Sequence, residues 1–168
     1  MVPELPIAML ACARIGAIHN VVFSGFSSQA LSCRVNFTAS KVILTADKGV
    51  RRGKSLDLKG IVDQALDSMP SIEHVIILKR TASNTFATGP KDIWWHDITD
   101  DVPTYCEPEI VDSMHLCIFF LLLEHQAAQR LFYVLLAAIL PMLTQQLSGS
   151  SILEMTIFIF VPVILDGY

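Results

Sequence analysis

Two short loops in this sequence carry the residue types that bind phosphate. The first, FSGFSS at residues 23–28, has a glycine that allows close backbone approach and serines that can cap a following helix. The second, DKGVRRGKS at residues 47–55, gathers Arg51, Arg52 and Lys54 around a glycine. Three cations on such a loop suit a phosphate group, although a solvated basic turn is the commoner origin of this pattern.

Each loop directly follows a short apolar run that is typical of a buried strand. Helical periodicities lie between these runs, so strands and helices alternate along the chain. This alternation predicts an α/β fold with a partial Rossmann-like parallel sheet flanked by helices. Ligands of open parallel sheets bind at the loops that follow the strands, and both the glycine-containing loop 23–28 and the basic loop 47–55 have this position. The predicted strands are residues 17–25, 41–47 and 73–80, and the predicted helices are residues 3–17, 27–40, 55–69 and 91–101.

The other chemistry-bearing side chains form no recognisable pattern. The four cysteines make no CxxC pair and no cluster with a histidine, so they predict neither a metal site nor a disulfide framework. The histidines are interpreted as ordinary core or surface residues, and the tryptophan pair as core. These residues are Cys12, Cys33, Cys106 and Cys117; His19, His74 and His96; and Trp94 and Trp95.

Charge is distributed unevenly along the chain. The net charge of −4 gives no case for a nucleic-acid partner, which requires a basic face. Residues 115–168 hold only four of the 28 acidic and basic residues, so the composition changes near Ser113. The first residues do not have the pattern of a secretory signal, so none is expected, and a cytoplasmic location is expected, with an organelle left open.

The apolar tail raises the alternative of a small membrane-associated protein anchored by residues 115–168. A spanning helix needs about 20 mostly apolar residues. The run from His115 to Leu143 is interrupted by polar and charged residues, and the last run contains Pro162. A membrane partner is therefore not expected.

Four segments, in this order, resemble acetyl-CoA synthetase (acetate–CoA ligase), a family of the adenylate-forming superfamily. They are VPELPIAMLACARIGAIHNVVFSGFSSQAL, KVILTADKGVRRGKSLDLKGIVDQAL, EHVIILKRT and WWHDI, and the resemblance covers about residues 2–113. It implies that residues 1–113 are a fragment of the N-terminal domain of an AMP-dependent synthetase/ligase.

The resemblance also implies a chemistry for the two loops. The family joins acetate and ATP with Mg²⁺ to form acetyl-AMP, and then transfers the acetyl group to coenzyme A. It implies coenzyme A contacts at Phe23, Gly25, Arg51 and Lys54, with Arg52 as a possible extra phosphate contact. Lys54 stands where the family has arginine, which keeps the charge but loses the bidentate fork.

The resemblance stops where the family continues with a glycine-rich loop, TSGSTGKPKG, that holds the phosphates of ATP. This chain has no glycine between Gly89 and Gly149, so such a loop cannot be built there. The acetate pocket and the C-terminal domain with its catalytic lysine are also expected to be absent. The chain as written is therefore expected to lack an ATP site and not to catalyse adenylation; a non-catalytic interaction protein remains a further possibility.

The hypothesis for residues 114–168 is an out-of-frame reading of the family sequence. Codons built from the last base of each codon and the first two of the next permit Asp-Ala-Pro-Leu-Tyr-Ile-Leu-Phe-Thr-Ser-Gly-Thr-Ser-Gly-Arg-Pro-Lys from Ser113 onward. In the same frame, residues 136–143 permit Gly-Gly-Tyr-Leu-Thr-Tyr-Ala, and residues 155–168 permit Asp-Asp-Ile-Tyr-Phe-Cys-Thr-Ser-Asp-Ile-Gly-Trp. A tail of this origin is not expected to pack against the core and is expected to promote aggregation.

Overall fold

The structure is a computed structural model that describes residues 2–51, 53–81, 89–100, 102–112, 115, 118–119 and 156–161. Its helices are α1 (Glu4–Arg14), α2 (Ser28–Thr38), α3 (Leu58–Leu66) and α4 (Trp95–Thr99). Its strands are β1 (Ile18–Phe23), β2 (Val42–Ala46), β3 (Lys48–Arg51), β4 (Lys54–Asp57), β5 (His74–Leu78), β6 (Asp92–Trp94), β7 (Ile118–Phe119) and β8 (Thr156–Val161).

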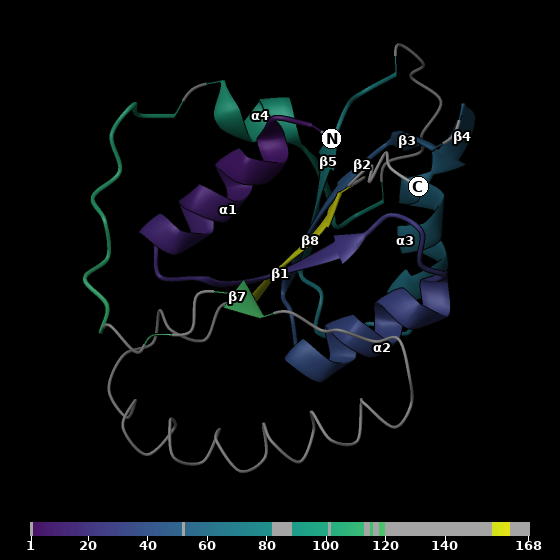
Figure 1. The fold of residues 1–168 in the computed structure, drawn as a ribbon, viewed down its shortest axis with the longest axis horizontal. Coiled ribbons are helices and arrows are strands. Elements are labelled where there is room, and N and C mark those ends of the chain that lie inside the picture. Colours follow the sequence, from purple (N-terminus) through teal and green to yellow (C-terminus); the bar gives the residue numbers. More distant parts are fainter. Residues whose placement is uncertain are drawn as a thin grey trace.

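A parallel sheet with helices on both sides forms the centre of the molecule. Six strands follow the order β6-β5-β2-β8-β1-β7, and every neighbouring pair is parallel. Helix α1 lies on one side of the sheet, and α2 and α3 lie together on the other (Figure 1). The α/β fold predicted from the alternation of strands and helices is therefore confirmed.

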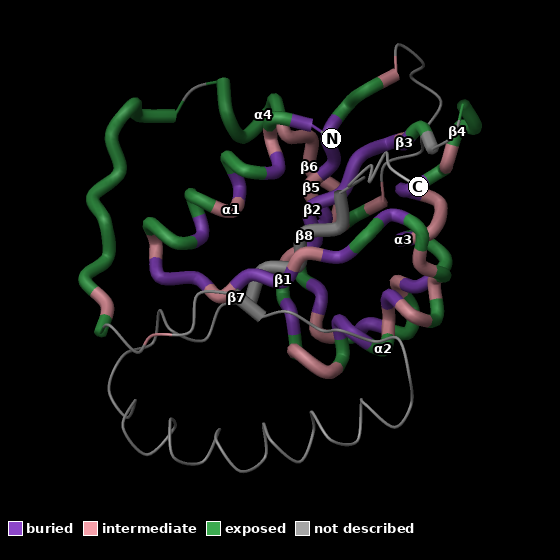
Figure 2. Tube along the Cα trace, viewed as in Figure 1, coloured by how far each residue is buried: buried purple, intermediate pink, exposed green. Residues whose placement is uncertain are grey.

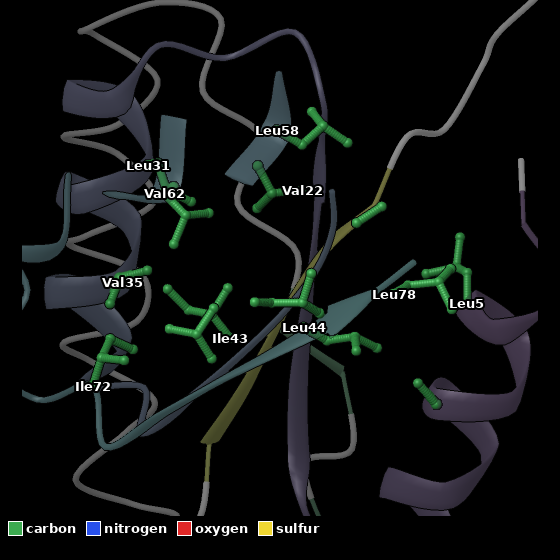
Figure 3. Packing of buried hydrophobic residues seen from close by; sticks show 14 of the residues in the cluster. Leu5, Val22, Leu31, Val35, Ile43, Leu44, Leu58, Val62, Ile72 and Leu78 are labelled. Carbon is green, nitrogen blue, oxygen red and sulfur yellow. The ribbon is translucent and has the colours of Figure 1, made fainter. Parts of the chain in front are cut away.

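Two layers of apolar side chains make the core, one on each face of the sheet. Buried residues are concentrated in the strands and on the inner faces of the helices (Figure 2). Ile43 of β2 lies toward Leu31 and Val62 of the α2–α3 layer, whereas Leu78 of β5 lies beside Leu5 of α1 (Figure 3). A strand that is buried on both faces of a sheet has a nearly continuous apolar sequence, as β2 and β5 do.

Helix termini are fixed by the residues that the sequence indicated. The Ser27 hydroxyl caps α2 by accepting from the Ala30 N–H at 3.3 Å. Gly16 follows the end of α1 with φ of +68°, a left-handed conformation that suits glycine. A Cβ at this position would lie 3.2 Å from Val111 Cγ1, so the segment that follows α4 packs closely on this turn.

Two predicted helices are shorter than expected, because pairing between strands overrides local propensity. Residues 54–57 form β4, antiparallel to β3, so the helix predicted from Ser55 begins at Leu58. Residues 92–94 form β6, parallel to β5, so the helix predicted over 91–101 is reduced to α4. Trp94 and Trp95 are half-buried against the core, as predicted.

The expectation that the tail does not pack is wrong for residues 156–161. These six residues form β8, which lies between β1 and β2 and pairs with both. The segment TIFIFV combines β-branched and aromatic residues, which favour a strand wherever two open strand edges accept it. Most of residues 115–168, the segment of the alternative membrane anchor, lies outside the described residues. Among the helices that are described, none could cross a bilayer.

Candidate functional site

The two candidate loops leave the sheet at the same edge and at the same height. Val22 and Thr45 are both in register with Phe160 of β8, so the ends of β1 and β2 are level. Two strand spacings separate them, which is about 10 Å. The loop after β1 and the loop after β2 are therefore neighbours at the carboxyl edge of the sheet, where ligands of such folds bind.

The loop after β1 is held against the start of α2. The Arg34 guanidinium lies over the Phe26 ring with its carbon 4.0 Å from the ring centroid, and its Nη1 donates to the Ala30 carbonyl at 2.8 Å. Arg34 is only 3% exposed, and burial lowers its pKa below the ordinary value. This cation–π contact fixes the loop, while Phe23 remains 37% exposed at the edge.

The loop after β2 is a β-hairpin that places two cations opposite each other. Arg51 of β3 is in register with Lys54 of β4, and the connection between them contains Gly53 with φ of +72°. Like charges at facing positions repel, and a bound anion between them would relieve that repulsion. Lys54 is exposed, whereas the side chain of Arg51 and the whole of Arg52 lie outside the described residues.

Asp47 anchors the base of this hairpin to the end of β5. Its Oδ1 accepts from the N–H groups of Lys48 (2.6 Å) and Arg80 (3.0 Å). Its Oδ2 accepts from the Thr81 N–H (2.9 Å) and hydroxyl (2.6 Å). Burial alone would raise the pKa of Asp47, but these hydrogen bonds favour the carboxylate and hold the pKa below its ordinary value.

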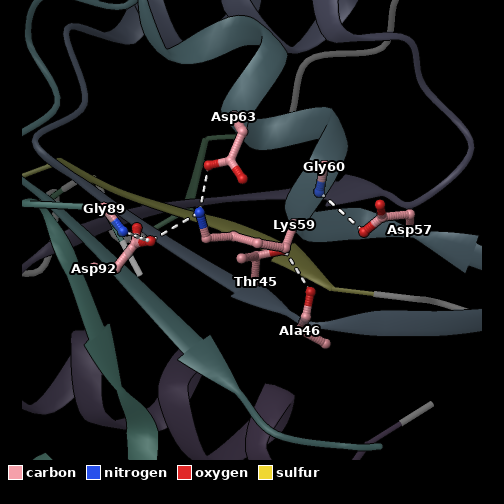
Figure 4. A network of polar contacts seen from close by, with 8 residues as sticks. All are labelled: Thr45, Ala46, Asp57, Lys59, Gly60, Asp63, Gly89 and Asp92. Atoms are coloured by element: carbon pink, nitrogen blue, oxygen red, sulfur yellow. Dashed lines mark hydrogen bonds and ion pairs between the residues drawn. The ribbon is translucent and has the colours of Figure 1, made fainter. Parts of the chain in front are cut away.

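A buried ion pair joins α3 to β6 (Figure 4). Lys59 of α3 reaches Asp92 of β6 with Nζ 2.9 Å from Oδ2, and it also contacts Asp63 one helical turn along. The side chains of Lys59 and Asp92 are 2% and 1% exposed, and the Asp92 carboxylate accepts from the Gly89 N–H at 2.6 Å. The backbone N–H of Lys59 donates to the Asp47 carbonyl, which joins this pair to the base of the hairpin.

Sequence reasoning placed the loops correctly and missed the side chains that support them. Phe23 ends β1 and Gly25 follows it, whereas the segment predicted as a loop at 47–55 is a hairpin in which Arg51 ends β3 and Lys54 begins β4. Arg34 and Lys59 were not singled out, although each is a charged residue on an otherwise apolar helix face. Such a residue predicts a buried partner, and that signal could have found both.

Comparison with known proteins identifies the family to which the chain belongs. Residues 1–120 match the family described as "AMP-binding enzyme". A solved acetoacetyl-CoA synthetase from Streptomyces lividans shares the fold with a TM-score of 0.60 at 20% sequence identity, over 68% of this chain and 17% of that one. The chain belongs to the AMP-binding enzyme family.

Within that family, the chain is similar to acetyl-coenzyme A synthetases. The Pseudoalteromonas atlantica protein is 50% identical over 115 residues, and the Penicillium chrysogenum protein is 49% identical over 113 residues. Each alignment covers 67% of this chain and 18% or 17% of the relative. The chain therefore spans less than a fifth of the length of these relatives.

Proposed function

We propose that residues 2–113 are part of an acetate–CoA ligase and contribute its coenzyme A contacts. The observation that supports this proposal is the meeting of two loops at one sheet edge, one with Phe23 and Gly25 and one with Arg51 and Lys54 at facing positions. The cations of the hairpin would bind the nucleotide phosphate of coenzyme A, with Arg52 as an additional contact. ATP and Mg²⁺ belong to the adenylation step of such an enzyme.

A binding measurement tests the role of the hairpin. We expect Lys54→Met to weaken coenzyme A binding to the chain about tenfold, because an exposed charge-assisted contact to phosphate is lost. Lys54→Arg should tighten binding, because guanidinium can hold phosphate with two hydrogen bonds. Isothermal titration with coenzyme A and with dephospho-coenzyme A separates the nucleotide phosphate from the rest of the ligand.

Lys41→Met is the matched control for this measurement. Lys41 precedes β2 at the opposite edge of the sheet, and its side chain forms an exposed ion pair with Glu73 at 3.5 Å. Its loss removes the same charge without touching the hairpin. Equal affinity of Lys54→Met and Lys41→Met, or equal affinity for the two forms of the ligand, would refute the proposed phosphate contact.

We further propose that residues 114–168 are an out-of-frame reading, so that the chain as written does not adenylate acetate. Three stretches of the tail permit family segments in the same alternate frame and in the right order. Sequencing the transcript across the Ser113 codon tests this proposal. We expect the alternate frame to encode Phe-Thr-Ser-Gly-Thr-Ser-Gly-Arg-Pro-Lys; an alternate frame without these glycines contradicts it.

A further inference from the structure

The strands β1 and β2 do not touch each other but face a common neighbour. Each pairs with β8, and within the described ranges no pairing joins them directly. Two strand spacings, about 10 Å, separate them. Residues 2–112 therefore present two parallel strand edges with room for one strand between them, a position that we call the central slot.

Two buried polar side chains of β1 border the central slot without hydrogen bonds. His19 is 2% exposed and Asn20 is fully buried. In the part of the chain that the structure describes, neither ring nitrogen of His19 and neither amide atom of Asn20 has a hydrogen-bond partner. Burial lowers the pKa of His19 and so favours the neutral ring, which has one donor and one acceptor to satisfy. Such groups are almost always paired in folded proteins.

The positions in register with these groups on the neighbouring strands carry no residue type that forms side-chain hydrogen bonds. His19 is in register with Ile157 of β8 and Ile118 of β7, and Asn20 is in register with Phe158 and Phe119. Residues in register on parallel strands lie on the same face of a sheet. All four positions hold hydrocarbon side-chain types, which offer neither donor nor acceptor.

We propose that the central slot is built to bind a parallel strand whose side chains in register with His19 and Asn20 form hydrogen bonds. Strand β8 pairs with both edges of the slot through its backbone, and its residues in register with His19 and Asn20 are Ile157 and Phe158. In the alternate-frame reading of residues 155–168, the codons that span residues 156–159 permit Asp, Ile and Tyr, and Asp and Tyr can form hydrogen bonds; this source of the strand rests on the proposed function. The polar requirement itself rests on the unpaired groups of β1.

A double-mutant cycle in the full chain tests the requirement at His19. Ile157→Thr adds a hydroxyl beside His19, and Ile157→Val is the control of matched shape without it. We expect His19→Leu to lower the unfolding equilibrium constant in the Ile157→Val chain, because an unpaired buried group is removed. In the Ile157→Thr chain, the decrease in the unfolding equilibrium constant caused by His19→Leu should be about fivefold smaller, or the constant should increase. The reason is that His19→Leu also removes a hydrogen bond in that chain. The same effect of His19→Leu in both chains, measured by urea unfolding, overturns the proposal.

A second mutant cycle and a second kind of measurement test the proposal without relying on a single variant or on reversible unfolding. Asn20→Leu is compared in Phe158→Thr and Phe158→Val chains, and hydrogen exchange of the Val21 and Val22 amides reports local opening of the slot in the native state. We expect Phe158→Thr to slow this exchange several-fold relative to Phe158→Val only when Asn20 is present. Equal exchange in all four chains contradicts the proposal. Neither cycle measures coenzyme A binding. The proposal on the slot can therefore be refuted while the proposed function holds, and the proposed function can be refuted while the proposal on the slot holds.

Discussion

Replacing Lys59 with methionine should destabilise the protein more than any change of an exposed charge. The substitution preserves much of the length of the side chain but removes the cation that faces Asp92, whose side chain is 1% exposed. An uncompensated carboxylate is then left in the interior, a change that typically costs about 3–5 kcal/mol. We expect thermal unfolding monitored by circular dichroism to show a melting temperature lower by roughly 10–20 °C.

Two further variants separate this effect from a loss of packing. In the double variant Lys59→Met/Asp92→Asn both charges are absent, and the Gly89 N–H retains an acceptor, so most of the lost stability should return. Lys41→Met breaks an exposed pair whose side chains are 47% and 58% exposed, and should cost less than about 1 kcal/mol. If the double variant is as unstable as Lys59→Met, the buried charge is not the cause.

The outline of the fold could be predicted because its signals are local. The runs that became β1, β2 and β5 are short, apolar and bounded by turn residues, and Ser27 and Gly16 mark helix ends through their own side chain or backbone. The candidate loops could be placed because they directly follow two of these strands. Their position at one edge then follows from parallel pairing alone.

The missed features depend on contacts between residues far apart in sequence. The strand β6 exists because β5 offers an open edge to residues 92–94, although the same residues read as part of a helix. Lys59 meets Asp92 across 33 positions, which no periodicity within a helix can show. The strand β8 was missed for a related reason: its place depends on the edges of β1 and β2, more than 100 residues earlier. Local pattern indicates that a segment can form a strand, and the rest of the sheet decides whether it does.

Replacing Asp47 should weaken both the stability of the protein and the base of the candidate site. Its carboxylate is 1% exposed and accepts four hydrogen bonds, two of them from Thr81. Asp47→Asn keeps the shape but turns an amide donor toward groups that also donate. Because hydrogen bonds to a charged group contribute about 1.5–3 kcal/mol each, we expect a loss of at least about 3 kcal/mol near neutral pH in urea unfolding.

The pH dependence of this loss identifies the charge of Asp47 as its cause. The pKa of Asp47 is held below the ordinary value of 3.8, so its contribution is fully present above that value and is lost as pH falls toward the lower pKa of the folded protein. Asp47→Asn has no proton to bind there, so the stability difference between the two proteins should shrink below about pH 4. Urea unfolding at pH 6, 4 and 3 measures this difference. A constant difference across the three values would mean that shape, and not the hydrogen-bonded carboxylate, fixes the hairpin to the sheet.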